Sequence, residues 1–329
     1  MRPVPTYIRC LIILVCLLIV RTCFGAPPKK KFTPRLQDLF VKIQPGAVSL
    51  DSTSCVIPFT RAGNLILIQA TVDTMVGNFI LDTGAPYLVL NITYFRDYQR
   101  TSSDAQQTSI SGSGTTIENT TVGSLSLGTL NYSRIPADLI SLGHIEQSKG
   151  VKILGLLGVS LFAQCEMIVD YEKSLIYLHR IGSKEKSSYR HEMLKDTAAY
   201  NSFPFSLKEN RIIATTEVAG KKLKFVIDHG AESNILDSRL PNKIFENVTI
   251  TGHVNILGSG NKKVDALYGD LQHMKMGNTE IGTLPVMVVN LEYTCFSAIG
   301  CVDGVLGFDF LSVHKIGFNF VNRKMYIWK

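Results

Sequence analysis

The sequence contains two near-copies of one pattern, an apolar strand that runs into an Asp-x-Gly turn. The first copy is Phe79–Ala85 and the second is Phe225–Ala231, and their aspartates, Asp82 and Asp228, lie 146 residues apart. A single Asp in a glycine turn is common, because both residues suit tight turns. A matched pair constrains the chain more strongly, since two carboxylates that meet can share one proton and activate a water.

The surroundings of the two aspartates repeat as well. The same offset relates Pro58-Phe59 to Pro204-Phe205, Asn64 to Asn210, and Gly112-Ser113-Gly114 to Gly258-Ser259-Gly260. Further along, an offset of 149 relates Gly128 to Gly277, Gly155–Gly158 to Gly304–Gly307, and Ile176-Tyr177 to Met325-Tyr326. These paired segments indicate a tandem duplication rather than a coincidence of short words.

Most of the chain reads as β-strand, with glycine and asparagine at the corners and few segments of helical period. We expect a hairpin over Ser109–Leu130 with the first glycine triplet at its tip, and a last strand at Lys324–Trp328. The predicted fold is mainly antiparallel β in two lobes. The predicted parts are a signal peptide at 1–25, an N-terminal arm at 26–50, the first repeat at 51–182, a linker at 183–200 and the second repeat at 201–329.

The N-terminus has the composition of a targeting segment. Arg2 and Arg9 precede an apolar run at Cys10–Val20, and small residues near Gly25 suit cleavage. The run is short for a bilayer span, so we predict a removed signal peptide and a secreted or periplasmic protein, with an uncleaved anchor as the alternative. No other stretch is apolar and long enough to cross a membrane, so we expect no stable membrane insertion after cleavage.

Composition narrows the classes of partner. The net charge is +7, and part of it lies in the targeting segment. No basic face is interleaved with aromatic residues, so we expect no nucleic-acid partner. The histidines are scattered and no Cys-x-x-Cys spacing occurs, so we expect no metal and no cofactor.

Four cysteines follow the targeting segment. Cys295 and Cys301 enclose five residues and are the better candidates for a disulfide in an exported protein. Cys55 and Cys165 would either tie the start of the first repeat to its end or remain two buried thiols. Four Asn-x-Ser/Thr triplets, at Asn91, Asn119, Asn131 and Asn247, offer glycan sites if the host glycosylates exported proteins.

At these residues the chain resembles the retropepsin-like aspartic proteases, with two of their units fused as in the pepsin-like enzymes. The resemblance rests on the strand into Asp82-Thr83-Gly84-Ala85 and on the later apolar-glycine stretches, Leu154–Gly158 and Val305–Phe308. It implies a bilobal aspartic-protease fold with two pseudo-symmetric, closed barrel-like lobes. It also implies a single-chain pseudo-dimer, monomeric in solution, that acts on polypeptide substrates.

The resemblance also implies roles for the paired segments. Asp82 and Asp228 would form the catalytic dyad of an exported endopeptidase, one as general base on a water and the other as proton donor to the scissile carbonyl. Thr83 would brace the two loops, while Gly84 and Gly230 allow the turns and the approach of substrate. The glycine tips at Gly112–Gly114 and Gly258–Gly260 would act as flaps over an extended peptide.

His229 departs from the family, which has Thr or Ser at this place. A threonine hydroxyl can both donate and accept a hydrogen bond and so brace one loop against the other. An imidazole is larger, and we expect that it cannot reproduce that geometry. Three interpretations follow. His229 is tolerated because Thr83 supplies half of the brace; or a protonated imidazole lowers the pKa values of the dyad; or the second motif has lost catalysis.

Other functional interpretations stay open. One is a catalytically inactive pseudoprotease that binds peptides or acts as a scaffold. Another treats both aspartates as turn residues of a duplicated β scaffold. A variant of the enzyme pairs the first repeats of two chains, although the short linker favours pairing within one chain. The N-terminal arm is either a plain exposed arm or an inhibitory pro-segment with Lys29–Lys31 toward the site.

Overall fold

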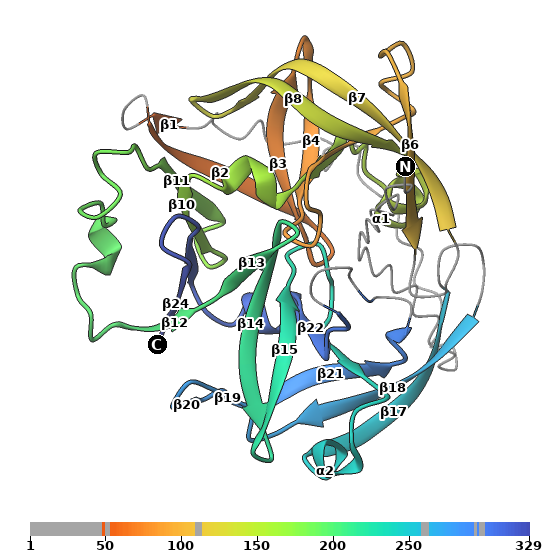
Figure 1. Ribbon diagram of the computed structural model, residues 1–329, viewed down its shortest axis with the longest axis vertical. Helices are drawn as coiled ribbons and strands as arrows, with labels where there is room; N and C mark the ends of the chain where they lie inside the picture. The colour runs from red at the N-terminus through yellow and green to blue at the C-terminus, as the bar shows by residue number, and fades with distance from the viewer. Residues whose placement is uncertain (1–47, 50–52, 109–113, 258–262, 293–294, 296–299) are drawn as a thin grey trace, which may run out of the picture.

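The computed structural model of the protein describes residues 48–49, 53–108, 114–257, 263–292, 295 and 300–329. The predicted signal peptide at 1–25 lies outside the described residues, and so does the predicted arm except for the short strand β1 (Val48–Ser49). Figure 1 shows the first repeat in the upper half of the molecule and most of the second in the lower half. The fold is mainly β and bilobal, as expected.

The first repeat is built from strands with short helical segments between them. Its elements are β2 (Ser54–Ala62), β3 (Leu65–Val72), β4 (Met75–Leu81), β5 (Leu88–Asn91), β6 (Thr101–Thr108), β7 (Gly114–Leu127), β8 (Leu130–Ile140), α1 (Gly143–Lys149), β9 (Gly155–Leu157), the 3-10 turn η2 (Val159–Phe162), β10 (Cys165–Asp170) and β11 (Leu175–Arg180).

The second repeat follows the same plan after the 3-10 turn η3 (Glu192–Leu194). Its elements are β12 (Tyr200–Pro204), β13 (Ser206–Lys208), β14 (Arg211–Val218), β15 (Lys221–Ile227), β16 (Ile235–Asp237), α2 (Asn242–Phe245), β17 (Val248–Leu257), β18 (Lys263–Leu271), β19 (Lys275–Met276), β20 (Thr279–Glu280), β21 (Leu284–Val289), β22 (Gly304–Leu306), α3 (Phe308–Leu311), β23 (Ile316–Asn319) and β24 (Lys324–Trp328).

The strand before each aspartate lies in a parallel pair at the centre of its lobe. β4 pairs in parallel with β9, and β15 pairs in parallel with β22. On its other side, β9 pairs with β5 and β22 pairs with β16, both antiparallel. The last three residues of these strands, Phe79–Leu81 and Phe225–Ile227, are buried. Burial on both faces of the sheet explains why both aspartates follow short continuous apolar runs.

The central strands β9 and β22 begin with glycines that the packing requires. A Cβ on Gly155 would overlap the carbonyl oxygen of Val89, and a Cβ on Gly304 would overlap the carbonyl oxygen of Ile235. Both positions also face the ring of a phenylalanine, Phe79 in one repeat and Phe225 in the other, within the strand that leads to the aspartate. The Gly-x-x-Gly stretches therefore let three strands meet closely behind each Asp loop.

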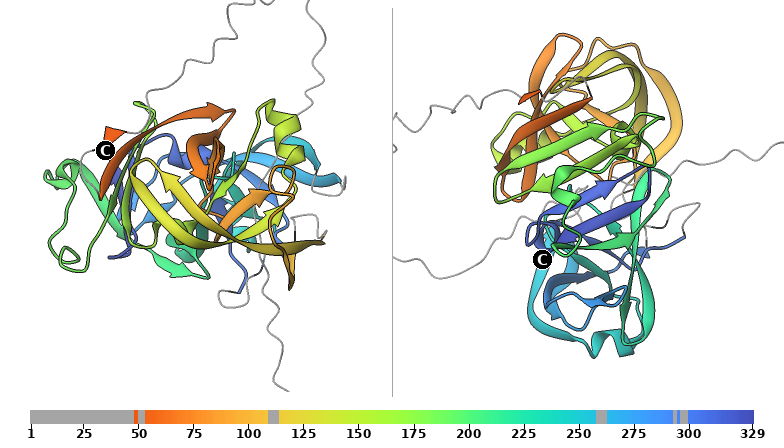
Figure 2. Two further views of the ribbon diagram at one scale, coloured as in Figure 1. Left: turned by 90° about the horizontal axis from the view of Figure 1, so that it is seen from above. Right: turned by 90° about the vertical axis from the view of Figure 1, so that its left-hand side faces the viewer.

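A shared sheet joins the two repeats. Its strands run in the order β12-β24-β23-β10-β11-β2, so that strands of the second repeat continue the sheet of the first. At the junction β10 pairs antiparallel with β23, from Glu166 opposite Asn319 to Val169 opposite Ile316. Figure 2 shows strands of both repeats in the layer between the lobes. The two repeats of one chain thus pair with each other.

Side chains secure the same junction. The buried Glu166 carboxylate accepts a hydrogen bond from Asn319 Nδ2 at 2.8 Å, and Lys315 Nζ lies 3.0 Å from Asp170 Oδ2. The largest apolar core runs through this sheet and contains buried residues of both lobes, while a smaller core lies within each lobe.

Some predicted boundaries were wrong. The hairpin expected over Ser109–Leu130 is instead formed by β6 with β7, and residues near Leu130 already belong to the next hairpin, β7 with β8. The sheets are mainly antiparallel, as predicted, and they also contain the parallel pairs β4–β9, β5–β8, β15–β22 and β16–β21. Within the described residues, no helix has the length and apolar character needed to span a membrane.

We predict that Gly304→Ala destabilises the second lobe by about 3 kcal/mol or more, because the added methyl has no space against the Ile235 carbonyl. Urea unfolding followed by circular dichroism measures the change. Gly282→Ala is the matched control, since a Cβ there meets nothing within 4 Å. Equal unfolding midpoints for the two variants would contradict the packing argument.

Candidate active site

Both aspartates end a strand and remain tied to the parallel pair behind it. The Asp82 N–H donates to the Leu157 carbonyl at 3.1 Å, and the Asp228 N–H donates to the Leu306 carbonyl at 3.0 Å. Each side chain is almost completely buried. The strand hydrogen bonds therefore fix the backbone at the start of both loops. The positions of the two carboxylates then depend on the aspartate side chains alone.

One backbone N–H binds both carboxylates. The Gly84 N–H donates to Asp82 Oδ1 at 2.9 Å and to Asp228 Oδ1 at 3.0 Å. The Ala85 N–H adds a bond to Asp82 Oδ1 at 2.9 Å, and the Gly230 N–H adds one to Asp228 Oδ1 at 2.7 Å. Two carboxylates that share a donor lie side by side, as the sequence interpretation required of a dyad.

The two glycines after the aspartates let each carboxylate pack against the opposite loop. A Cβ on Gly84 would lie 2.6 Å from Asp228 Cγ, and a Cβ on Gly230 would lie 2.7 Å from Asp82 Cγ. Real Cβ atoms do not approach other atoms so closely, so only glycine fits. Glycine is needed at both positions because a carboxylate from the other repeat approaches the backbone there.

Burial sets the protonation of the pair. It raises the pKa of Asp82, against the lowering effect of the N–H groups of Ala85 and Gly84 and of the Arg211 charge. Burial and the neighbouring Asp82 charge raise the pKa of Asp228 well above its usual range. Two adjacent buried carboxylates cannot both ionise cheaply, so the pair holds one proton between its members.

The outer oxygens of the pair, Oδ2 of Asp82 and Oδ2 of Asp228, are buried and form no hydrogen bond with the described residues. Buried carboxylate oxygens normally have partners. Two such acceptors, one from each repeat, are suited to bind a water or a substrate oxygen in common.

Thr83 and His229 connect the two loops. Thr83 Oγ1 accepts a hydrogen bond from the His229 N–H at 2.9 Å and donates to the Ile227 carbonyl at 3.0 Å. His229 Nδ1 also lies 3.0 Å from Thr83 Oγ1. The Ile227 carbonyl can only accept, so we assign the hydroxyl proton to that bond and the donor role in the second contact to Nδ1. Thr83 therefore supplies the hydroxyl half of the brace, and the imidazole takes part through a different bond, from Nδ1 to Thr83 Oγ1.

His229 is held as a neutral ring. It is buried, its ring packs edge-on against Phe318 with centroids 5.7 Å apart, and burial lowers its pKa to about 3. With Nδ1 protonated, Nε2 is a bare acceptor, and it has no hydrogen-bond partner among the described residues. The interpretation in which a protonated imidazole lowers the pKa values of the dyad is contradicted.

The predicted flap tips fall almost wholly outside the described residues. Gly112, Ser113, Gly258, Ser259 and Gly260 lie there, and Gly114 is the first residue of β7. The strands leading to both positions are described: β6 pairs with β7 as far as Thr108 opposite Gly114, and β17 pairs with β18 as far as Leu257 opposite Lys263. The flap roles remain predictions.

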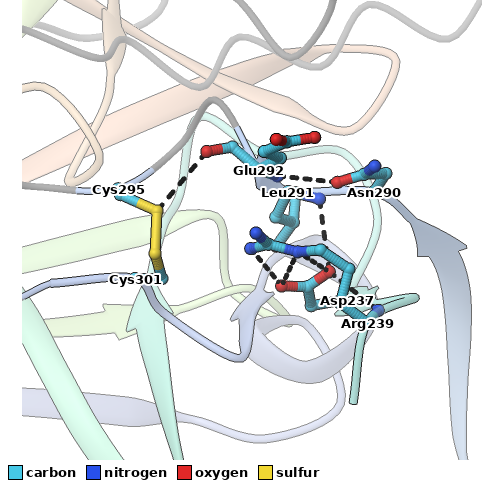
Figure 3. Close-up of a disulfide and its surroundings, with 7 residues drawn as sticks. All are labelled: Asp237, Arg239, Asn290, Leu291, Glu292, Cys295 and Cys301. Atoms are coloured by element: carbon cyan, nitrogen blue, oxygen red, sulfur yellow. Dashed lines mark hydrogen bonds and ion pairs between the residues drawn. A yellow bond between two sulfur atoms is a disulfide. The ribbon is translucent and has the colours of Figure 1, made fainter.

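The cysteines divide into one disulfide and two thiols. Cys295 and Cys301 form a disulfide, and Cys55 and Cys165 are free and buried. Figure 3 shows the disulfide beside the end of β21, where the Leu291 N–H donates to Asp237 Oδ1 at 3.3 Å. Asp237 also pairs with Arg239 at 2.7 Å, so one carboxylate of β16 holds the backbone that leads into the disulfide loop.

The lobes also meet through residues that the sequence analysis did not assign. Lys149, at the end of α1, pairs with Glu232 of the second Asp loop at 2.5 Å. Asn64, noted only as a repeated asparagine, donates through its N–H to Glu232 Oε2 at 3.3 Å and through Nδ2 to the Glu232 carbonyl at 3.1 Å. Pro86 occupies the equivalent place in the first repeat, so no repeated motif marks this contact.

Arg211 is another residue to which the sequence analysis assigned no role. It is almost fully buried at the start of β14, and its charge interacts with Glu209, Asp228 and Asp82. A signal was present, because an arginine precedes the apolar run Ile212–Ala214 at the position where the first repeat has Leu65. Within the described residues, no group of His, Cys, Asp and Glu side chains is arranged to hold a metal ion.

Comparison with known proteins places one aspartate in each of two matched segments. A profile described as aspartyl protease matches residues 68–161 and 214–310, which together exceed half of the chain. No curated protein matches.

Solved structures align over most of the chain at low identity. Conglutin gamma, a basic 7S globulin from lupine seeds, has a TM-score of 0.48 and 10% identity over 84% of this chain and 95% of its own. The aspartic proteinase of Irpex lacteus has a TM-score of 0.46 and 11% identity over 84% and 97%. Basic 7S globulin from soybean has a TM-score of 0.46 and 9% identity over 84% and 94%.

We predict that His229 makes the fold less stable in acid. Its pKa is lowered on folding, so the unfolded chain binds the proton and stability falls as pH drops from about 6.5 toward 3. Relative to His229→Thr, the wild type should lose about 2 to 3 kcal/mol of unfolding free energy between pH 7.5 and pH 4.5. Urea titrations at both values measure it.

The exposed His253 supplies the control, as His253→Thr removes a histidine from the surface of the same lobe. A pH dependence that is the same in His229→Thr and the wild type would show that His229 does not change protonation on unfolding.

Proposed function

The chain belongs to the aspartyl protease family, and we propose that it is an endopeptidase that hydrolyses peptide bonds with Asp82 and Asp228 as its catalytic pair. The observation that carries the proposal is the single Gly84 N–H that donates to both carboxylates, at 2.9 and 3.0 Å. It holds the two groups side by side in a buried place, where they share one proton.

In the proposed reaction each carboxyl group accepts one proton and donates one proton. The ionised carboxylate takes a proton from a water whose oxygen attacks the carbonyl carbon, while the protonated carboxylic acid gives its proton to the carbonyl oxygen. The product of this step is a tetrahedral diol, and the two carboxyl groups have exchanged roles. The newly protonated carboxyl then protonates the amide nitrogen, and the other takes a proton from a hydroxyl as the C–N bond breaks. The dyad returns to its starting state.

The surroundings support these steps. The outer oxygens of Asp82 and Asp228 are buried without a hydrogen-bond partner, so they are available to the water and the substrate oxygen. The N–H groups on Oδ1 hold the carboxyl groups in place while the proton moves. The neutral His229 completes the Thr83 brace without adding a charge beside the pair.

We also propose that the protein is exported. The Cys295–Cys301 disulfide supports this, because disulfides persist in oxidising compartments. The basic and apolar N-terminal segment suits a signal peptide.

We predict that Asp82→Asn and Asp228→Asn each lower peptide cleavage by about 10³-fold or more, since either change removes the shared proton arrangement. The assay is cleavage of a mixed peptide library between about pH 3 and 8, a range that brackets carboxylate and histidine titration. Asp97→Asn, an exposed aspartate of the first repeat, is the control.

Each other outcome has a distinct meaning. Loss of activity only in Asp82→Asn would indicate pairing between the first repeats of two chains, which a mass measurement at assay concentration would test. A wild-type protein that cuts no peptide at any pH, with or without its N-terminal arm, would overturn catalysis and leave peptide binding as the function.

Export is tested on the protein as its host makes it. We expect the purified chain to begin at Ala26, which intact-mass measurement and N-terminal sequencing determine. An intact N-terminus in the membrane fraction would instead support an uncleaved anchor.

A further inference from the structure

Arg211 lies opposite the second aspartate in the strand ladder. β14 pairs antiparallel with β15, with Ile212 opposite Ile227 and Ile213 opposite Val226. Continuing this register by one residue puts Arg211 opposite Asp228. Residues that face each other in an antiparallel pair lie on the same side of the sheet. The arginine therefore shares its face of the sheet with the carboxylate, as Ile213 does with Val226.

The first repeat has no charge at the equivalent position. There β3 pairs with β4 with Leu67 opposite Ile80, and continuing this register by two residues puts Leu65 opposite Asp82. Leu65 is 1% exposed and belongs to the apolar core of its lobe, together with Leu67 and Ile80. The duplicated frame is thus the same in both lobes, and the side chain across from the aspartate is leucine in one and arginine in the other.

The Arg211 side chain is buried and remains charged. It is 2% exposed, and although burial lowers its pKa to about 10, it is a cation throughout the acid and neutral range. The groups whose charges or dipoles face it are Glu209 on its own turn, Asp228 at the end of β15, and Asp82 and Tyr87 from the first repeat.

Glu209 competes with the dyad for this cation. Arg211 Nη1 lies 3.7 Å from Glu209 Oε2 and donates to the Glu209 carbonyl at 3.3 Å. The turn that holds them together has two residues with positive φ, Glu209 at 47° and Asn210 at 54°. Since Glu209 is partly exposed whereas the arginine is not, the opposing charge is partly screened by solvent, and the dyad is the better shielded partner.

We propose that Arg211 is a positioning residue that keeps the Asp82–Asp228 pair singly ionised at acid pH and makes its two carboxylates inequivalent. This inference rests on the proposed function for its catalytic readout. A buried cation beside an acidic pair stabilises its charged forms, so both macroscopic pKa values of the dyad are lower with Arg211 than without it. The active pH window therefore lies at lower pH than two carboxylates among apolar side chains alone would give.

The first test replaces Arg211 by leucine, the residue at the equivalent position of the first repeat, Leu65. We expect Arg211→Leu to shift both limbs of the pH profile of kcat/KM upward by about one pH unit, because a nearby opposite charge typically shifts a carboxyl pKa by that amount or more. Arg211→Lys should keep the limbs near their wild-type positions. Leu65→Met, a change of similar volume in the first repeat, should leave the profile in place.

The second test should shift the pH profile of kcat/KM downward. Glu209→Gln removes the competing anion and leaves the arginine charge to the dyad alone, so we expect a downward shift of both limbs. A structural role for Arg211 would not produce opposite shifts in Arg211→Leu and Glu209→Gln. An Arg211→Leu variant that loses activity equally at all pH values, with Arg211→Lys behaving the same, would overturn the proposal.

A direct titration separates this inference from the proposed function. Carboxyl ¹³C shifts of protein labelled at aspartate, assigned with Asp82→Asn and Asp228→Asn, report the pKa values of the pair without any substrate. Shifted titrations in a chain that cuts nothing would retain the role of Arg211 and reject catalysis. Unchanged titrations in both Arg211→Leu and Glu209→Gln would reject the role of Arg211, whereas Arg211→Lys is expected to titrate like the wild type. If Arg211→Leu does not fold, Glu209→Gln carries the measurement alone.

Discussion

The arrangement of this protein depends on the approach of two buried carboxylates to each other's glycine. Asp82 packs against Gly230 and Asp228 packs against Gly84, at distances that no other residue allows. Each carboxylate packs on a glycine of the other repeat, so the conformation of each loop depends on the other loop. The parallel pairs β4–β9 and β15–β22 fix the loops, and the shared sheet through β10 and β23 fixes the lobes on which the loops stand.

Burying two acids in one place is costly, and the structure offsets that cost in two ways. Backbone N–H groups of Gly84, Ala85 and Gly230 bind the inner oxygens, which stabilises ionised carboxylate without adding a mobile charge. Arg211 adds a buried cation on the side of Asp228. Together they favour one negative charge on the pair, because full protonation forfeits these interactions and full ionisation sets two charges against each other.

The fold class and the two aspartates were predictable because the duplication repeats short segments at a nearly constant spacing, 146 residues around the aspartates and 149 residues further along. The spacing is kept where the backbone must be the same. Gly155 and Gly304 keep it because each meets a carbonyl oxygen in the same place. His229, Arg211 and Glu232 lie where the repeats differ, so comparison of the repeats gave no role for the last two. The hairpin boundaries failed because glycine-rich tripeptides mark a turn and leave the lengths of the strands beside it open.

The differences between the repeats indicate what fusion into one chain makes possible. A pair of identical first repeats would put Leu65 across from both aspartates and Thr83 in both halves of the brace, so its carboxylates would be equivalent by symmetry. In the fused chain Arg211 lies on one side only, and a neutral His229 replaces one hydroxyl of the brace. A second arginine in the other repeat would bring two buried cations to one pair that holds a single negative charge, and one cation would then lack compensation. The single charge of the dyad is therefore matched by a single arginine, which only an asymmetric pair of lobes can supply.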